Sequence, residues 1–238
     1  MPLPAHLIPT WILRRFLILL LVLPAMAAAS DDTSRAPKIL AIGDSMMSWH
    51  SVGAASVPHA LARLLDEPVQ NAAIAGARIV SPIPPLRISA QYGAAPERDW
   101  DWVVVNGGGN DLVFGCGCRA CDNRIARMIG PKGQRGDIPK LVRNIRKTGA
   151  RVVYVGYLRS PGVNSAIDIC APQGDELERR LSAMAAQDKG VYFLPIHDLV
   201  PHKDTSFHSL DMVHPSRKGS HAIATRIAAL IRAKDRAR

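Results

Sequence analysis

The chain has 238 residues, which is enough for one α/β domain with a sizeable core, and we do not expect a second domain. Its formal net charge is +10, but aromatic residues make up only 5%, whereas nucleic-acid surfaces interleave basic and aromatic side chains, so we expect no nucleic-acid partner. The excess charge is interpreted as a solvated basic face suited to anionic envelope polymers, formed by Arg119, Arg124, Arg127, Lys132, Arg135, Lys140, Arg143, Arg146, Lys147 and the tail after Arg226.

The first 29 residues have the pattern of an export signal. Arg14 and Arg15 precede an uninterrupted apolar run, residues 16–23, and small residues follow at positions 25 and 27–29. The run is shorter than the ~20 residues that span a bilayer, which disfavours the alternative of a membrane anchor. We therefore expect residues 1–29 to be a signal peptide and residues 30–238 to be a single exported domain, periplasmic or secreted, with no stable membrane anchor.

Apolar segments alternate with helical segments along the rest of the chain. This alternation predicts right-handed crossovers and a parallel sheet covered on both faces. Strands are expected at residues 38–42, 69–74, 102–106, 151–158 and 191–196, and helices at 54–65, 86–92, 123–129, 138–148, 175–187 and 215–233, with loops around the cysteines.

The first expected strand ends at Gly43, Asp44 and Ser45. A buried parallel strand that stops at such residues delivers a hydroxyl to the carboxyl edge of the sheet, where open α/β folds bind their ligands. Ser45 is therefore the candidate nucleophile, and it needs a base, an acid that orients the base, and donors for an oxyanion.

The base and its acid are expected just before the last helix. Asp211 and His214 lie three residues apart in a turn, so the carboxylate can hold Nδ1 of the imidazole and leave Nε2 for a serine. His214 also follows the fifth strand, at the edge where Ser45 emerges. Weaker candidates in the same region are His197, His202 and His208.

Three groups at the same edge could bind an oxyanion: the backbone amide of Ser45, the backbone amide of Gly76, and the side chain of Asn110. Gly76 suits an amide that a ligand must approach closely, and the glycines at 107–109 allow the same approach at Asn110.

Four cysteines, an even number, favour two disulfides in an exported chain. The alternative is a four-sulfur zinc site, but paired C-x-x-C knuckles are missing. Spacing does not fix the connectivity. We expect a bond from the loop of residues 116–121 to the fourth cysteine, which would join two loops; the cysteines are Cys116, Cys118, Cys121 and Cys170.

These motifs together resemble the SGNH, or GDSL-type, hydrolase superfamily. Its four blocks are matched in order by Gly43-Asp44-Ser45, by Asn71 with Gly76, by Gly108-Gly109-Asn110-Asp111, and by Asp211-Met212-Val213-His214. The resemblance implies a three-layer α/β/α sandwich of flavodoxin-like type with a parallel five-stranded sheet, and hydrolysis of an ester. It also implies Ser45 as nucleophile, His214 as base, Asp211 as its acid, and Ser45, Gly76 and Asn110 as oxyanion donors.

Two features depart from the family pattern. Met46 stands where the Leu of GDSL would be, a mild change because an apolar residue is retained. The cysteine insert of residues 116–121 is not part of the common core, and we expect it to shape the substrate entrance. The missing second glycine of a G-x-S-x-G elbow argues against the ordinary α/β-hydrolase fold.

The sequence thus predicts an exported serine esterase that needs no metal or cofactor. Trp49, His50 and Tyr92 are expected near the site, and they favour a small acyl group on a sugar, such as an O-acetyl group on a glycan, or another short-chain acyl ester. Lysophospholipase, thioesterase and acyltransferase activities with the same triad are alternatives. A non-catalytic protein that binds an envelope glycan is a further alternative from another class.

Overall fold

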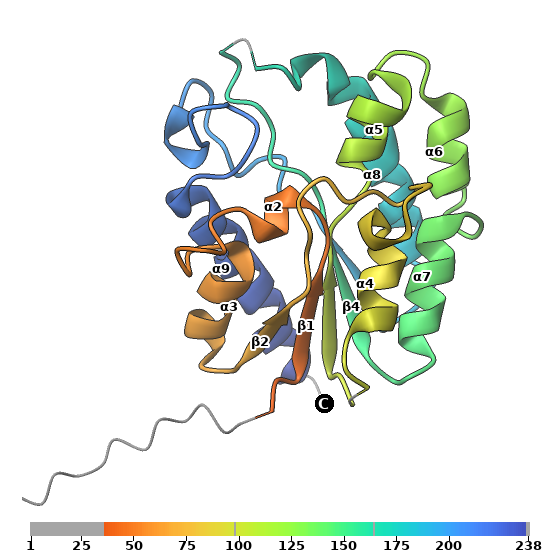
Figure 1. The fold of residues 1–238 in the computed structure, drawn as a ribbon, viewed down its shortest axis with the longest axis vertical. Helices are drawn as coiled ribbons and strands as arrows, with labels where there is room; N and C mark the ends of the chain where they lie inside the picture. The colour runs from red at the N-terminus through yellow and green to blue at the C-terminus, as the bar shows by residue number, and fades with distance from the viewer. Residues whose placement is uncertain (1–35, 98, 164, 237–238) are drawn as a thin grey trace, which may run out of the picture. The chain divides into compact units, whose positions relative to one another are not determined.

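The computed structural model describes residues 36–97, 99–163 and 165–236, so the signal peptide expected at residues 1–29 lies outside the described residues. Five parallel strands form one sheet in the order β2-β1-β3-β4-β5 (Figure 1). Within these described ranges, no helix is both long and apolar enough to cross a bilayer. The strands are β1 (Ile39–Ile42), β2 (Val69–Asn71), β3 (Trp102–Val105), β4 (Arg151–Val155) and β5 (Val191–Leu194).

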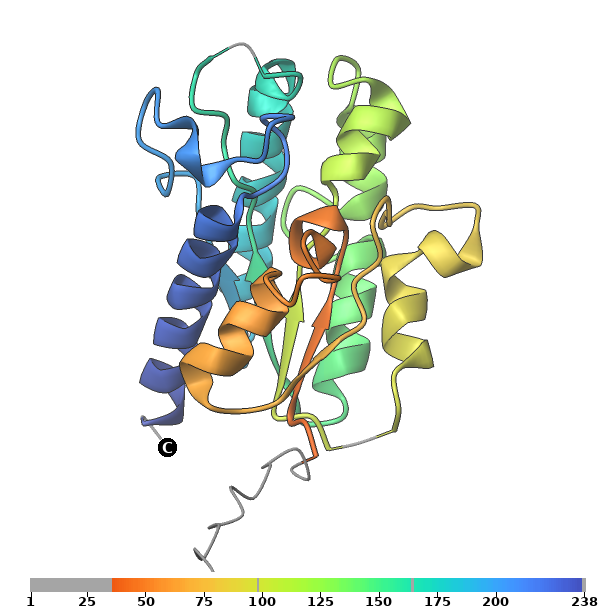
Figure 2. The same ribbon diagram turned by 60° about the vertical axis from the view of Figure 1, so that its left-hand side comes forward.

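The sheet is the middle of three layers, because side chains alternate between its two faces. On β1, Ile39 and Ala41 pack into one buried cluster with α3 and α9, while Leu40 and Ile42 pack into another with the remaining large helices. Figures 1 and 2 show the two helical layers on opposite sides of the sheet. The helices are α3 (Val57–Leu65) and α9 (Arg217–Asp235) on one face, and α4 (Ile88–Ala94), α5 (Gly109–Cys116), α6 (Asp122–Met128), α7 (Asp137–Arg146) and α8 (Ala171–Ala185) on the other.

Strand β1 lies between β2 and β3 and fixes the registers of both. Ile39 is the partner of Val69 on one side and of Trp102 on the other. The chain moves outward from β1 to β2 and then returns to the other side of β1. This reversal is the topological switch point of a flavodoxin-like sheet, where ligands bind beyond the carboxyl ends of the strands.

The five strands and the covered parallel sheet are confirmed, but every strand is somewhat shorter than expected, and β2 and β4 are shorter by three residues each. Strand β2 ends at Asn71, whose side-chain Oδ1 accepts a hydrogen bond from the Ala73 amide and turns the chain. Strand β4 ends at Val155, because the Tyr157 amide donates to Glu178 Oε1 of α8 instead of to a neighbouring strand.

The helix α5 and the first residues of α8 were not expected. Helix α5 occupies the first part of the expected cysteine loop, and α8 begins at Ala171, inside the expected loop of residues 160–174. Glycine residues at the start of α5 and within α8 weaken the helical pattern of both segments in the sequence. Gly108 adopts φ +111° before α5, while a Cβ at Gly174 within α8 would overlap the Arg159 guanidinium. Tertiary packing therefore overrides a poor local helical pattern.

All four cysteines form disulfides, which confirms disulfide pairing over the zinc alternative. Cys116 pairs with Cys121, and Cys118 pairs with Cys170. The second bond is the expected link from the cysteine loop to the segment before α8. It joins the segment just after α5 to the 3₁₀ turn Asp168–Cys170 across a sequence separation of 52 residues.

The two disulfides should differ in their effect on stability, because closing a longer loop removes more entropy from the unfolded chain. Replacing Cys118 and Cys170 by alanine should lower the free energy of unfolding by roughly 4 kcal/mol. The same change at Cys116 and Cys121 should lower it by only about 2 kcal/mol. Urea unfolding of both double variants measures the difference, and an equal loss in the two would contradict the expectation.

Candidate active site

Ser45 lies at the carboxyl end of β1, as the first residue of the short helix α2 (Ser45–Ser48). Asp44 is the N-cap of this helix, and its Oδ1 accepts a hydrogen bond from the Met46 amide at 2.9 Å. Gly43 precedes it with φ +156°, and a Cβ there would lie 2.8 Å from the Asn106 carbonyl oxygen, so the turn requires glycine. These residues explain why β1 passes directly into a helix at this point.

Gly43 is also held by two hydrogen bonds to a side chain of α4. Its amide donates to Gln91 Oε1 at 2.8 Å, and Gln91 Nε2 donates back to the Gly43 carbonyl at 2.9 Å. Gln91 is buried on α4, so both groups are paired away from water. The pair holds the backbone just before Ser45 in one position.

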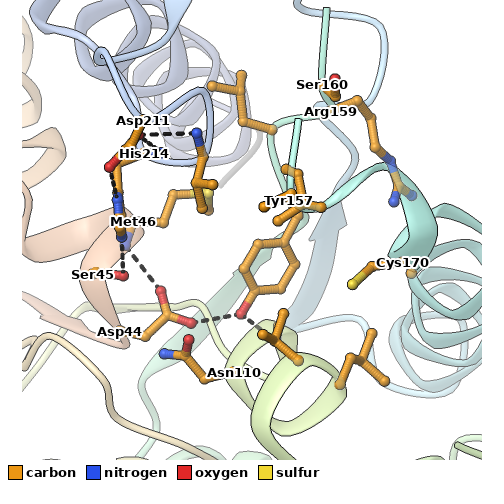
Figure 3. Close-up of a pocket in the computed structure, with 18 of the residues that line it drawn as sticks. Asp44, Ser45, Met46, Asn110, Tyr157, Arg159, Ser160, Cys170, Asp211 and His214 are labelled. Atoms are coloured by element: carbon orange, nitrogen blue, oxygen red, sulfur yellow. Dashed lines mark hydrogen bonds and ion pairs between the residues drawn. The ribbon is translucent and has the colours of Figure 1, made fainter. Parts of the chain in front are cut away.

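Ser45, His214 and Asp211 form a continuous hydrogen-bonded chain (Figure 3). His214 Nε2 lies 2.8 Å from Ser45 Oγ, and His214 Nδ1 lies 2.6 Å from Asp211 Oδ2. With the proton on Nδ1, the imidazole donates to Asp211 and accepts from the serine hydroxyl. The structure thus brings together all three residues of the expected triad, although they are separated by up to 169 positions.

The loop that carries His214 is held by several backbone contacts. Asp211 Oδ1 accepts hydrogen bonds from the amides of Val213 and His214, each at 3.0 Å. The Ser165 hydroxyl donates to the carbonyl of Met212, a residue with φ +54°. These contacts fix the turn from which the Asp211 carboxylate reaches the imidazole.

Asp211 remains ionised through the physiological range. Partial burial raises the pKa of its carboxyl group, but the hydrogen bonds from His214 and from the His214 and Val213 amides outweigh that effect and hold the pKa below its ordinary value. A carboxylate in this state can orient the imidazole and stabilise its protonated form.

The expected oxyanion donors line the same cavity as Ser45. Gly76 lies after β2 with φ +77°, and Asn110 lies in the first turn of α5. Asn110 Nδ2 donates to the Ala77 carbonyl at 3.0 Å, which orients the amide and uses one of its two N–H groups. Asn71, from the second motif block, instead bonds Ser51 and Ala73 and holds the loop after β2.

A cavity of about 950 Å³ extends from Ser45 between α5 and the start of α8. Apolar side chains dominate its lining. Cys170 contributes to one wall and is bonded to Cys118, but none of residues 116–121 lines the cavity, so the expected role of the cysteine insert at the entrance stays a prediction. The apolar lining includes Met46, Leu112, Val113, Phe114, Leu158 and Ile167.

Not every aromatic residue expected near the site lies there. Trp49 lines the cavity, but His50 and Tyr92 are not among its lining residues. The prediction for Tyr92 is wrong, because α4 runs back along the sheet, away from the edge that carries Ser45. The Tyr92 hydroxyl lies 3.5 Å from Oγ1 of Thr148, which comes just before β4. Among the histidines considered as weaker candidates for the base, His197 lines the cavity and lies beside Glu178. His208 is not among the lining residues, and burial lowers the pKa of its imidazole.

Comparison with known proteins places this fold and its motifs in one family. The model of the GDSL-like lipase/acylhydrolase family matches residues 41–222, which is more than half of the chain. The chain belongs to this family. It is therefore an SGNH/GDSL-type serine hydrolase that acts on ester bonds, as its motifs predicted.

Solved structures share the fold of this GDSL hydrolase at low sequence identity. An inhibitor-bound aryl esterase of M. smegmatis is 17% identical, with a TM-score of 0.62 over 83% of this chain and 99% of that one. A family two carbohydrate esterase of Clostridium thermocellum, in complex with cellohexaose, is 19% identical, with a TM-score of 0.56 over 84% and 65%. A Slackia heliotrinireducens protein assigned to the SGNH hydrolases is 23% identical, with a TM-score of 0.56 over 83% and 100%. The comparison with curated proteins found no match.

Two buried carboxylates of the GDSL hydrolase motifs hold the loops around the site. Asp111 accepts hydrogen bonds from the Ile79 and Val80 amides at 2.8 and 2.9 Å, which fixes the loop that follows Gly76. Burial raises its pKa, and the bonds from the two amides oppose that rise. Asp111 therefore has a positioning role, which explains why an acid follows Asn110 in the motif.

Asp44 is part of a second network, which the sequence did not reveal. Tyr157 donates its hydroxyl to Asp44 Oδ2 at 2.7 Å, and the same oxygen of Tyr157 accepts from the Gly109 amide at 2.7 Å (Figure 3). Burial, followed by the charge of Asp44, raises the pKa of Tyr157 well above its ordinary value, so it stays a donor. The sequence placed Tyr157 inside the expected strand of residues 151–158, so it gave no signal that Tyr157 lies two residues after β4, at this edge.

Tyr157→Phe should destabilise the hydrolase in a pH-dependent way. Burial raises the pKa of Asp44 and the Tyr157 bond lowers it, so losing the bond raises it further. At neutral pH we expect a loss of about 1.5–3 kcal/mol in the free energy of unfolding, since a charge-assisted bond disappears. The loss should shrink as pH falls and Asp44 becomes protonated in the variant first. Urea unfolding between pH 8 and pH 4 measures this trend, and a pH-independent difference would contradict it.

Proposed function

We propose that this hydrolase is an exported serine esterase that uses Ser45 as nucleophile, His214 as general base and Asp211 as the acid that orients the base. The observation that carries the proposal is the pair of short contacts in one chain, 2.8 Å from Ser45 to His214 and 2.6 Å from His214 to Asp211. Ser45, at one end of this hydrogen-bonded series, lines a large cavity through which an ester can reach its hydroxyl.

In the acylation half-reaction, Ser45 Oγ attacks the carbonyl carbon of the ester and its proton moves to His214 Nε2. The imidazolium is stabilised by the Asp211 carboxylate. Collapse of the tetrahedral intermediate breaks the bond to the alcohol oxygen, and His214 returns the proton to the leaving alcohol. An acyl group then remains on Ser45.

Deacylation repeats these steps with water. His214 takes a proton from the water, whose oxygen attacks the acyl carbon, and the proton then returns to Ser45 Oγ as the carboxylic acid leaves. In both half-reactions the negative oxygen would be bound by the amides of Ser45 and Gly76 and by the second N–H of Asn110. Losing one such donor typically costs about 3–4 kcal/mol of transition-state stabilisation.

The cavity supports an apolar acyl group. Its size and apolar lining, from Met46 to the segment around Ile167, suit an aryl or medium-chain acyl ester better than the O-acetyl group expected from the sequence. The lysophospholipase and thioesterase alternatives fit this lining for the same reason. An acetylated glycan would leave most of the cavity unfilled by its acyl group.

Export of the mature chain is supported by the two disulfides. Disulfides persist in oxidising compartments such as the periplasm and the extracellular space, and Cys118–Cys170 joins segments that are 52 residues apart. The expected signal at residues 1–29 completes the proposal.

Ser45→Ala should abolish ester cleavage while leaving the fold intact. We expect a fall in kcat of at least about 10⁴-fold on p-nitrophenyl butyrate, because removing a triad nucleophile removes covalent catalysis. An organophosphonate probe should label the wild-type protein at Ser45, as identified by peptide mass spectrometry, and should not label the variant. Unchanged activity in Ser45→Ala would refute the proposal.

The length of the acyl chain distinguishes the two substrate classes. Across p-nitrophenyl esters from two to twelve carbons, kcat/KM should rise from acetate to a medium chain by about 4-fold per methylene that enters the cavity, at ~0.8 kcal/mol each. Leu112→Trp, which reduces the cavity, should move the optimum to shorter chains. A maximum at acetate, together with faster release of acetate from acetylated sugars, would instead support the glycan substrate.

A further inference from the structure

Trp49 makes a contact with the base that the triad description leaves out. Its indole ring stacks on the imidazole of His214, with ring centroids 3.8 Å apart and planes inclined by only 5°. Trp49 is also the C-cap of α2, and its amide donates to the Ser45 carbonyl at 2.8 Å. Trp49 therefore ends the short helix that begins at Ser45 and also covers one face of the His214 imidazole.

The indole is itself fixed to the loop that carries His214. Trp49 Nε1 donates to Ser209 Oγ at 3.0 Å, and the Ser209 hydroxyl donates to the Pro215 carbonyl at 3.0 Å. The Ser209 amide donates to the His214 carbonyl at 2.8 Å. Ser209 thus connects the indole to the backbone of His214 and Pro215, so the indole cannot leave the imidazole without breaking its bond to Ser209.

A ring in this position interacts differently with the two charge states of the base. The face of an indole carries negative charge density, so it attracts an imidazolium more strongly than a neutral imidazole. His214 becomes an imidazolium only when Ser45 gives up its proton. Because this interaction strengthens on the way to the transition state, it accelerates the reaction instead of only binding the ground state.

We propose that Trp49 is a positioning residue that holds His214 in line with Ser45 and stabilises its protonated form. The inference rests on the proposed triad. Two carboxylates around His214 also interact with its charge, Asp211 at 2.6 Å and the buried Asp44, and the ring of His50 lies 6.2 Å from that of Trp49. All three are retained in the variants below.

The test compares Trp49→Leu, which keeps an apolar side chain without a π face, with Trp49→Phe, which keeps a smaller aromatic ring. Trp49→Leu should lower kcat about 2- to 30-fold, the range of one cation–π interaction, with a smaller change in KM. The acidic limb of the profile of kcat/KM against pH should also move to lower pH, because the base is then less easily protonated. Trp49→Phe should restore part of both effects.

Two further variants separate positioning from general damage to the loop. Ser209→Ala keeps the indole but removes the hydroxyl that binds it, and it should lower kcat by less than Trp49→Leu. Val52→Ala changes a fully exposed side chain in the turn that follows Trp49 and should behave as wild type. Thermal unfolding of each variant checks the fold, and Trp49→Phe with Ser209→Ala carries the test should Trp49→Leu fail to fold.

The rate at which an organophosphonate modifies Ser45 gives a second readout that does not depend on the size of the substrate. It should fall in parallel with kcat in Trp49→Leu. An unchanged acidic limb, or a change in KM alone, would show that Trp49 only lines the cavity and would overturn the inference. Labelling of another residue, or activity in Ser45→Ala, would instead overturn the proposed triad itself.

Discussion

The position of β1 is the constraint on which the site depends. Because β1 pairs with β2 on one side and β3 on the other, the segments after all three strands meet at one edge of the sheet. Ser45 follows β1, Gly76 follows β2, and Asn110 follows β3. The reciprocal bonds between Gly43 and Gln91 fix the end of β1 against α4. Backbone pairing therefore sets the distances between groups that are far apart in sequence.

Buried polar groups then hold the loops at this edge in one conformation. Asp111 binds the amides of the loop after β2, while Asp44 binds the start of α2 and the hydroxyl of Tyr157. Burying a carboxylate is costly, and the raised pKa of each group reflects that cost. The hydrogen bonds of the two carboxylates offset this cost, and they fix the positions of the loops around Ser45. Two of the acids in the sequence motifs thus position the site, whereas Asp211 acts on the imidazole directly.

The apolar cavity lies beside a disulfide that starts in the cysteine insert. Helix α5 supplies Leu112, Val113 and Phe114 to one wall, and the segment around Ile167 supplies another. The Cys118–Cys170 disulfide joins these two walls, which belong to separate loops of the sheet edge. The disulfide adds a covalent link between these walls to the packing of α5 against α8. The family fold provides the sheet edge that carries Ser45, and the Cys118–Cys170 disulfide joins two segments beside the cavity at that edge.

The sequence by itself determined the five strands and the covered parallel sheet, and it named the catalytic candidates Ser45, His214 and Asp211 and the candidate oxyanion donors Gly76 and Asn110, because strand patterns and short motifs are local. It did not determine α5 and the early start of α8, since Gly108 and Gly174 obscure the helical pattern. It also misplaced Tyr92 and gave no role to Tyr157 or to the ring stack of Trp49 on His214. Those contacts join residues 48 to 165 positions apart, and only the tertiary structure decides them, because nothing in a local pattern specifies which distant side chains meet.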